Sequence, residues 1–353
     1  KSNMKKILFV VVMAALAAAT VFAQYTPVNG GEDIADFYSP TFLADGASVT
    51  SMESPSGDLL NPAVSGLKQR TVLDVSYIAL LNFDNTAANY GYRGHAANLG
   101  TTIPSKYGVF NLSGHFFHAP YENVNLGTLG GVDFSFAKDL FPNFLIGAGL
   151  HTVFGYNTSF DWGLALNLGV LHLPGDIGFM KDFRWGVAVQ GMGKWFAPID
   201  GYSGYPAPFT PVIGARFSLI RAENINWGWN LDLGFPSFQN MDITVGTSVN
   251  IAELITVSLT GHYDIVELTN PDVSARSFIP SFGIAFNFTT DIKEEADFFS
   301  SRGWNKNDVK IQTAAAPMQG SVWAIGAGVN IPFGLVDSEG PEIDVQYPEK
   351  EYI

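Results

Sequence analysis

Large apolar residues alternate with small or polar residues along much of the chain. From Trp162 to Val170 every second residue is large and apolar, and the residues between them are glycine, alanine or asparagine. Successive side chains of a β-strand point to opposite faces, so this pattern predicts a strand with one large apolar face and one small face. Residues 183–189 and 323–331 repeat it. Three separated copies indicate an architecture built from such strands.

Weaker copies of the alternation predict further strands along the chain. They lie at 73–81, 92–101, 110–116, 132–136, 144–154, 213–219, 225–235, 243–249, 255–263, 282–288 and 308–316. The best count is fourteen strands, with twelve or sixteen as alternatives. A soluble β-sandwich would carry lysine, glutamate and threonine on its minor faces, whereas these faces are mainly glycine, alanine, asparagine and serine. We therefore predict an all-β fold, a transmembrane antiparallel β-barrel over residues 70–333.

The first 23 residues read as a secretory signal peptide. Lys5 and Lys6 precede an apolar run from Ile7 to Ala19, and the expected cleavage site lies before Gln24. After this segment no stretch is long and apolar enough for a membrane helix. Export of such a chain is expected to end in the outer membrane. The absence of cysteine excludes a disulfide framework.

Residues 24–69 break the alternation and end near the motif Asn61-Pro62-Ala63. Proline fixes its own φ and restricts the residue before it, so this motif predicts a rigid bend before the first strand. An N-terminal segment, this motif and a barrel of this length resemble the FadL-type outer-membrane transporter superfamily, especially its PorV-like and uncharacterised spirochaetal branch. The resemblance implies a 14-stranded barrel plugged by an N-terminal hatch. We call residues 24–69 the hatch.

The last twenty residues, 334–353, form an acidic tail after the final strand. It contains Pro341 and Pro348. We expect a periplasmic linker to a C-terminal domain missing from this chain, with a short extension as the alternative.

Several polar residues sit between lipid-facing apolar neighbours and are expected to point into the lumen. They are Asp74, Asp133, His151, Arg184, Gln190, Lys194, Arg216 and Asp232. A lysine or arginine facing lipid near the midplane would cost roughly 2–4 kcal/mol. Two roles remain open for this set: a salt-bridge network that braces the lumen, or the lining of a permeation route or ligand pocket.

Charge and residue chemistry exclude several functions. The chain has 19 basic and 33 acidic residues, a net charge of −14, so we expect no nucleic-acid partner. His115 and His118 are three residues apart, which places them on opposite faces of a strand and prevents joint ligation of a metal. No phosphate-binding loop is present in the sequence. We therefore expect no enzyme activity, no catalytic residue, no metal site and no cofactor.

These features together predict an outer-membrane β-barrel for passive uptake or binding of small apolar solutes. Its expected partners are outer-membrane lipid and a small apolar solute. A PorV-like scaffold that binds secreted proteins or an envelope machine is one alternative. A surface adhesin is another.

Overall fold

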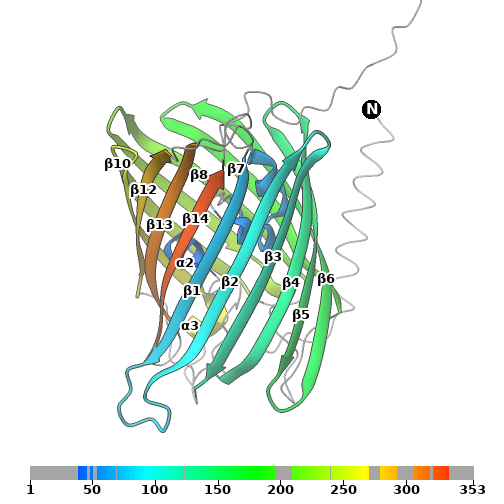
Figure 1. Ribbon diagram of the computed structural model, residues 1–353, viewed down its shortest axis with the longest axis vertical. Coiled ribbons are helices and arrows are strands. Elements are labelled where there is room, and N and C mark those ends of the chain that lie inside the picture. The colour runs from blue at the N-terminus through cyan, green and yellow to red at the C-terminus, as the bar shows by residue number, and fades with distance from the viewer. Residues whose placement is uncertain are drawn as a thin grey trace, which may run out of the picture.

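Fourteen antiparallel strands close into a single barrel in the computed structural model (Figure 1). The structure describes residues 39–45, 48–50, 54–68, 70–121, 125–194, 209–238, 240–269, 279–291, 306–318 and 321–333. The strands are β1 (Thr71–Asn82), β2 (Gly91–Ser105), β3 (Gly108–Pro120), β4 (Asn125–Phe141), β5 (Phe144–Tyr156), β6 (Phe160–Ile177), β7 (Met180–Lys194), β8 (Thr210–Ala222), β9 (Ile225–Gly234), β10 (Asp242–Ile251), β11 (Ile255–Asp264), β12 (Ser281–Asp291), β13 (Lys306–Pro317) and β14 (Val322–Phe333). The predicted fold class and the count of fourteen are confirmed.

Each strand pairs with its sequence neighbours, and β1 pairs with β14 to close the ring. The closing register places Asp74 opposite Asn330. Because a closed barrel has no free edge, every strand has two hydrogen-bonded neighbours, as a hydrocarbon environment requires.

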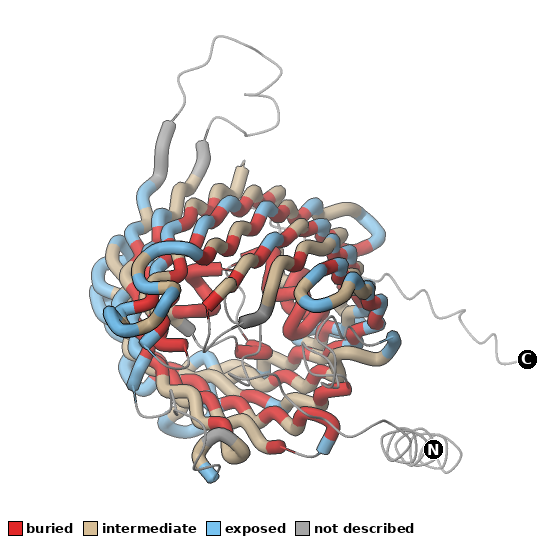
Figure 2. The backbone as a smooth tube through the Cα atoms, turned by 90° about the horizontal axis from the view of Figure 1, so that it is seen from below, coloured by how far each residue is buried: buried red, intermediate tan, exposed pale blue. Residues whose placement is uncertain are grey.

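Burial alternates along the strands, as Figure 2 shows in alternating red and paler segments. Leu99, Val132, Leu150, Leu166 and Leu231 are exposed on the outer surface. Such a continuous apolar outer face suits acyl chains, whereas the inner face carries the small and polar residues. The alternation in the sequence therefore separates the lipid face from the lumen face.

The strand connections distinguish the two ends of the barrel. Two-residue turns join β2 to β3 and β4 to β5 at one end, which we call the turn end. The opposite end, the loop end, carries the connection 83–90 between β1 and β2. In outer-membrane barrels short turns face the periplasm and longer loops face outward.

The described part of the hatch lies inside the ring of strands (Figure 2). It comprises helix α2 (Pro40–Asp45) and two 3-10 helices, η2 (Pro55–Leu59) and η3 (Pro62–Leu67). Two further short helices, η4 (Pro236–Phe238) and α3 (Ile265–Thr269), lie in the connections at the loop end. The predicted signal peptide and the acidic tail lie outside the described residues.

No helix among the described residues has the length and apolar character needed to cross a membrane.

Candidate functional site: the hatch and the lumen

The motif Asn61-Pro62-Ala63 lies against the inner wall and begins helix η3. Asn61 is fully buried and caps this helix, because its side-chain oxygen accepts from the backbone N–H of Ala63 at 3.0 Å. Its Nδ2 donates to Val49 O at 2.9 Å and to Val170 O at 3.1 Å. One side chain thus joins two pieces of the hatch to strand β6.

Glycines on three adjacent strands make room for this motif. A Cβ on Gly147 would collide with the backbone of Pro62 and Ala63, and a Cβ on Gly169 would collide with the Asn61 side chain. A Cβ on Gly186 would lie 3.1 Å from Asn61 Nδ2. The small inner face of β5, β6 and β7 is therefore the surface on which the hatch sits.

Amide side chains of the wall bind the backbone carbonyls of residues 55–60. Asn111 Nδ2 donates to Pro55 O at 2.9 Å, Asn167 Nδ2 to Leu59 O at 3.0 Å, and Gln190 Nε2 to Leu60 O at 2.8 Å. A buried peptide carbonyl without a partner is costly, so these three amides satisfy hatch carbonyls at the two ends of η2. Gln190, one of the predicted lumen residues, is a hatch anchor.

Asp58 attaches the hatch to β4. Ser135 donates a hydrogen bond to its carboxylate, and Asp58 is buried. Burial raises the pKa of Asp58 well above its usual range, and the nearby charge of Asp133 acts in the same direction. The hatch is therefore held most firmly when Asp58 is neutral.

The inner wall near the loop end is apolar on one side of the barrel. Leu43 and Leu59 of the hatch pack there against buried wall residues, among them Leu80 and Phe117. The complete cluster, which we call the apolar mouth, comprises Leu43, Leu59, Ile78, Leu80, Ala96, Phe117, Ala119, Tyr121, Leu129, Val153, Ala314, Ala316, Met318, Val322 and Ala324.

A polar pocket of about 380 Å³ lies near the turn end, on strands β6 to β11. Arg184 and Arg216 face each other across the β7–β8 pairing and both line it. Arg216 Nη2 lies 3.4 Å from Ser248 Oγ. We call this pocket, with Asp182, Ser218, Asn226, Ser248, Asn250 and Thr256 in its lining, the polar vestibule.

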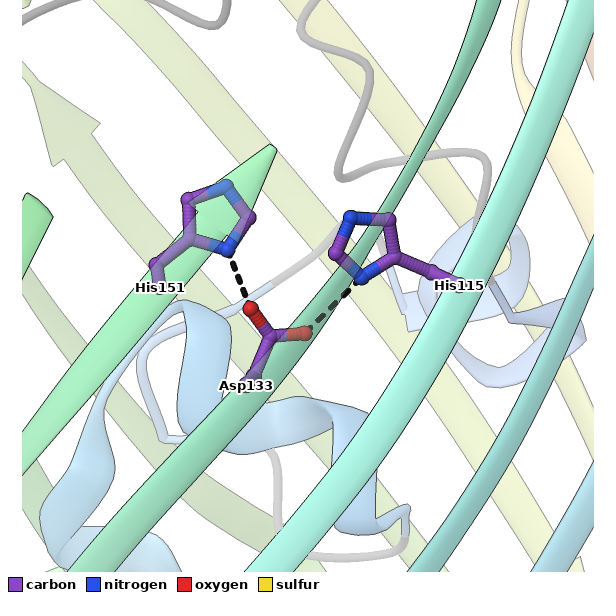
Figure 3. Close-up of side chains that lie close together, drawn as sticks. All are labelled: His115, Asp133 and His151. Atoms are coloured by element: carbon purple, nitrogen blue, oxygen red, sulfur yellow. Dashed lines mark hydrogen bonds and ion pairs between the residues drawn. The ribbon is translucent and has the colours of Figure 1, made fainter. Parts of the chain in front are cut away.

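Asp133 and His151 meet a third side chain, His115, on the lumen face (Figure 3). His115 Nδ1 lies 2.8 Å from Asp133 Oδ2, and His151 Nδ1 is bonded to Asp133 Oδ1. The two imidazole rings are stacked with centroids 5.4 Å apart. The carboxylate on β4 therefore joins histidines on β3 and β5.

Asp74 and Asp232 lie away from the cluster of Asp133 with the two histidines. Asp74 accepts from Asn330 Nδ2 at 3.0 Å and so links β1 to β14 where the barrel closes. Asp232 lies against Gly214 on β8, next to Val49 of the hatch. Within the predicted set, Asp133 meets His151 and Arg184 faces Arg216.

Lys194 is on the outer face, and the expectation that it points inward is wrong. Gly191 has a φ of +71° and the β6–β7 register shifts between Leu166 and Leu168, so the inward and outward positions exchange beyond this bulge. Lys194 Nζ bonds Asp161 Oδ1 at 2.7 Å and lies 4.3 Å from the Trp162 ring centroid.

The sequence pattern did not predict His115 as a site residue. It also did not predict three wall residues that bind the hatch, Asn111, Asn167 and Ser135. The separation of His115 and His118 onto opposite faces is confirmed, since His118 bonds Thr128 and stacks with His95 on the outer side. The partners of His115 lie on a neighbouring strand, and only the inter-strand register reveals them.

Solved structures with the same fold were found by comparison of the whole chain. The "CymD monoaromatic hydrocarbon channel" aligns with a TM-score of 0.56 and 11% identity, covering 87% of this chain and 100% of that one. The "TodX deltaS2S3 mutant monoaromatic hydrocarbon channel" gives 0.52 and 10%, with coverages of 84% and 99%. The Ralstonia pickettii toluene transporter TbuX gives 0.50 and 11%, with 83% and 97%. At these identities the similarity establishes the fold.

No protein-family model matches the chain, and no curated protein matches it. A closed barrel with a lipid-suited outer face and the fold of these channels is an outer-membrane protein.

Proposed function

We propose that this barrel passively admits or binds small apolar solutes at its apolar mouth. The observation that carries the proposal is the apolar inner wall near the loop end, because the interior of a water-filled porin is polar. Two of the channels with the same fold are described as monoaromatic hydrocarbon channels, and this is the solute class we adopt.

The hatch decides how a solute would pass. Leu43 and Leu59 belong to the apolar mouth, and the same hatch is fixed to the wall through Asn61, Asp58 and the wall amides. These side chains are packed together and buried, so a solute from the loop end reaches them only when the packing opens. Its further passage requires the hatch or the neighbouring wall to yield.

Uptake by intact diderm cells tests this function. Cells that express the full chain should accumulate a labelled monoaromatic hydrocarbon several-fold faster than cells without it. Phe117→Gln places a polar group in the apolar mouth and should reduce uptake toward the background rate. Phe117→Leu keeps this position apolar and should retain uptake.

Expression and folding of each variant are checked by the amount of intact barrel in isolated outer membranes. Equal uptake by cells with and without the folded barrel, across several monoaromatic and aliphatic solutes, would contradict the proposed function. Equal uptake by Phe117→Gln and the unsubstituted chain would show that solutes do not pass the apolar mouth.

A further inference from the structure

We propose that His115, Asp133 and His151 form a binding site for one divalent transition-metal ion of the zinc class. Each residue comes from a different strand, β3, β4 and β5, and the register sets Asp133 directly opposite His151. One ligand atom from each residue lies within 4.8 Å of the others. Figure 3 shows both imidazoles turned toward the single carboxylate. The proposal is independent of the proposed uptake function.

The donor set has the chemistry of a zinc-type site. Two imidazole nitrogens and one carboxylate oxygen suit Zn²⁺ and its neighbours in the first transition row, and three protein ligands leave a fourth position for water or a solute group. Metal–ligand bonds of about 2.0–2.2 Å bring ligand atoms to roughly 3–3.5 Å from one another. The observed separations reach up to 4.8 Å, so the side chains move closer together when all three bind one ion.

Hydrogen bonds hold the three side chains together in the metal-free arrangement. Each Nδ1 is bonded to one oxygen of Asp133, so the carboxylate already orients both rings. If both Nδ1 atoms bind the ion, neither of them can carry a proton. Each proton then moves to Nε2 of the same ring or is released to solvent.

The surroundings fix the site in place. The side chains of His115, Asp133 and His151 are 0%, 6% and 12% exposed, so the site is almost fully enclosed. Gly131 lies opposite His115, and a Cβ there would come within 2.6 Å of the ring nitrogen Nε2. Ser113 Oγ lies 3.3 Å from Asp133 Oδ2 and supports the carboxylate. Partners of this kind orient metal ligands and strengthen binding.

An ion at this position would join three strands where the wall is irregular. In the β4–β5 pairing Gly130 lies opposite Phe154 and Asp133 lies opposite His151, and the positions between these two pairs are missing from the ladder. There the Thr152 hydroxyl accepts from the N–H of Val132 and donates to its C=O. A side chain here substitutes for part of the backbone ladder. We infer that the ion stabilises this part of the wall.

Metal binding to the full chain, purified without a histidine tag and stripped with a chelator, tests the proposal. We expect one Zn²⁺ per chain by elemental analysis after dialysis, and visible absorption bands when Co²⁺ replaces it. His115→Gln and His151→Gln should each weaken Zn²⁺ binding about tenfold or more. His172→Gln is the matched control, because this histidine contacts Phe144 and Trp185 away from the site, and it should bind as the unsubstituted chain does.

The zinc X-ray absorption spectrum of the unsubstituted chain gives a readout that does not depend on variant folding. It should show nitrogen and oxygen ligands, with two imidazoles. Less than stoichiometric binding, a spectrum without imidazole ligands, or equal affinity in both site variants and the control would overturn the proposal. The three residues would then be a hydrogen-bonded brace alone.

Discussion

The apolar mouth and the polar vestibule are built on one barrel, yet their inner surfaces are opposite in character. The mouth near the loop end is lined by residues such as Leu80 and Phe117 and includes two leucines of the hatch. The vestibule near the turn end carries Arg184 and Arg216, and its lining residues all lie on strands β6 to β11. The difference indicates that the lumen has two environments, and Leu43 and Leu59 place part of the hatch in the apolar one.

The largest expected difference is in stability. Leu80 is fully buried in the apolar mouth, so Leu80→Ala should lower the free energy of unfolding by about 2–5 kcal/mol. Asn250 lines the vestibule and donates to Thr256 Oγ1 at 2.8 Å, so Asn250→Ala should cost only about 0.5–1.5 kcal/mol. Denaturant titration of both variants in lipid vesicles measures the two values. Equal losses would remove the energetic distinction between the two regions.

A second comparison uses two inner-face glycines. Gly147→Ala sets a methyl group against the backbone of the hatch, which cannot move as a flexible side chain does, so we expect a cost of about 1–3 kcal/mol and a higher conductance to small ions as the hatch is displaced. Gly228→Ala in the vestibule meets its nearest atoms at 3.5 Å or more and should leave both properties close to those of the unsubstituted chain. Planar-bilayer recordings with matched unfolding curves measure the outcome. If the Gly147→Ala barrel has the conductance and the stability of the unsubstituted barrel, the hatch does not rest on this wall.

The smallest expected effect, counted per pH unit, is the response of stability to pH. Burial raises the pKa of Asp58 in the folded protein above its unfolded value of about 3.9, so the folded state binds the proton more tightly than the unfolded state. The free energy of unfolding should therefore fall as pH rises above about 4, by up to about 1.4 kcal/mol per pH unit until Asp58 has ionised in the folded state.

Asp58→Asn removes this ionisation and keeps an oxygen that can accept from Ser135. Relative to this variant, the unsubstituted chain should lose stability with rising pH. A constant difference between the two from pH 4 to pH 9 would show that folding does not raise the pKa of Asp58.

The strands were predictable because each depends on a local alternation of residues. The pattern at Trp162–Val170 gives the lipid and lumen faces without knowledge of any neighbouring strand. Lys194 shows where this reasoning ends, because the bulge at Gly191 reverses the faces and the many glycines of the chain give no sign of which one bends the backbone.

The contacts of the candidate site depend on register and on the hatch, which local patterns do not contain. Asp133 and His151 were expected in the lumen, but their meeting with His115 follows from the pairing of three strands. Gln190 was predicted to face inward, yet its bond to Leu60 requires knowing how the hatch lies. In a regular strand the local sequence therefore indicates side-chain direction, whereas the contact partners depend on the fold.

The wall amides Asn111, Asn167 and Gln190 bind peptide carbonyls of the hatch. Every residue type supplies that carbonyl, so these three bonds place no restriction on which side chains occupy positions 55, 59 and 60. These three hydrogen bonds therefore do not depend on the identity of the side chains at these positions. Selection or design could therefore rewrite Leu59, which faces the apolar mouth, to alter solute preference while the same anchors continue to seat the hatch.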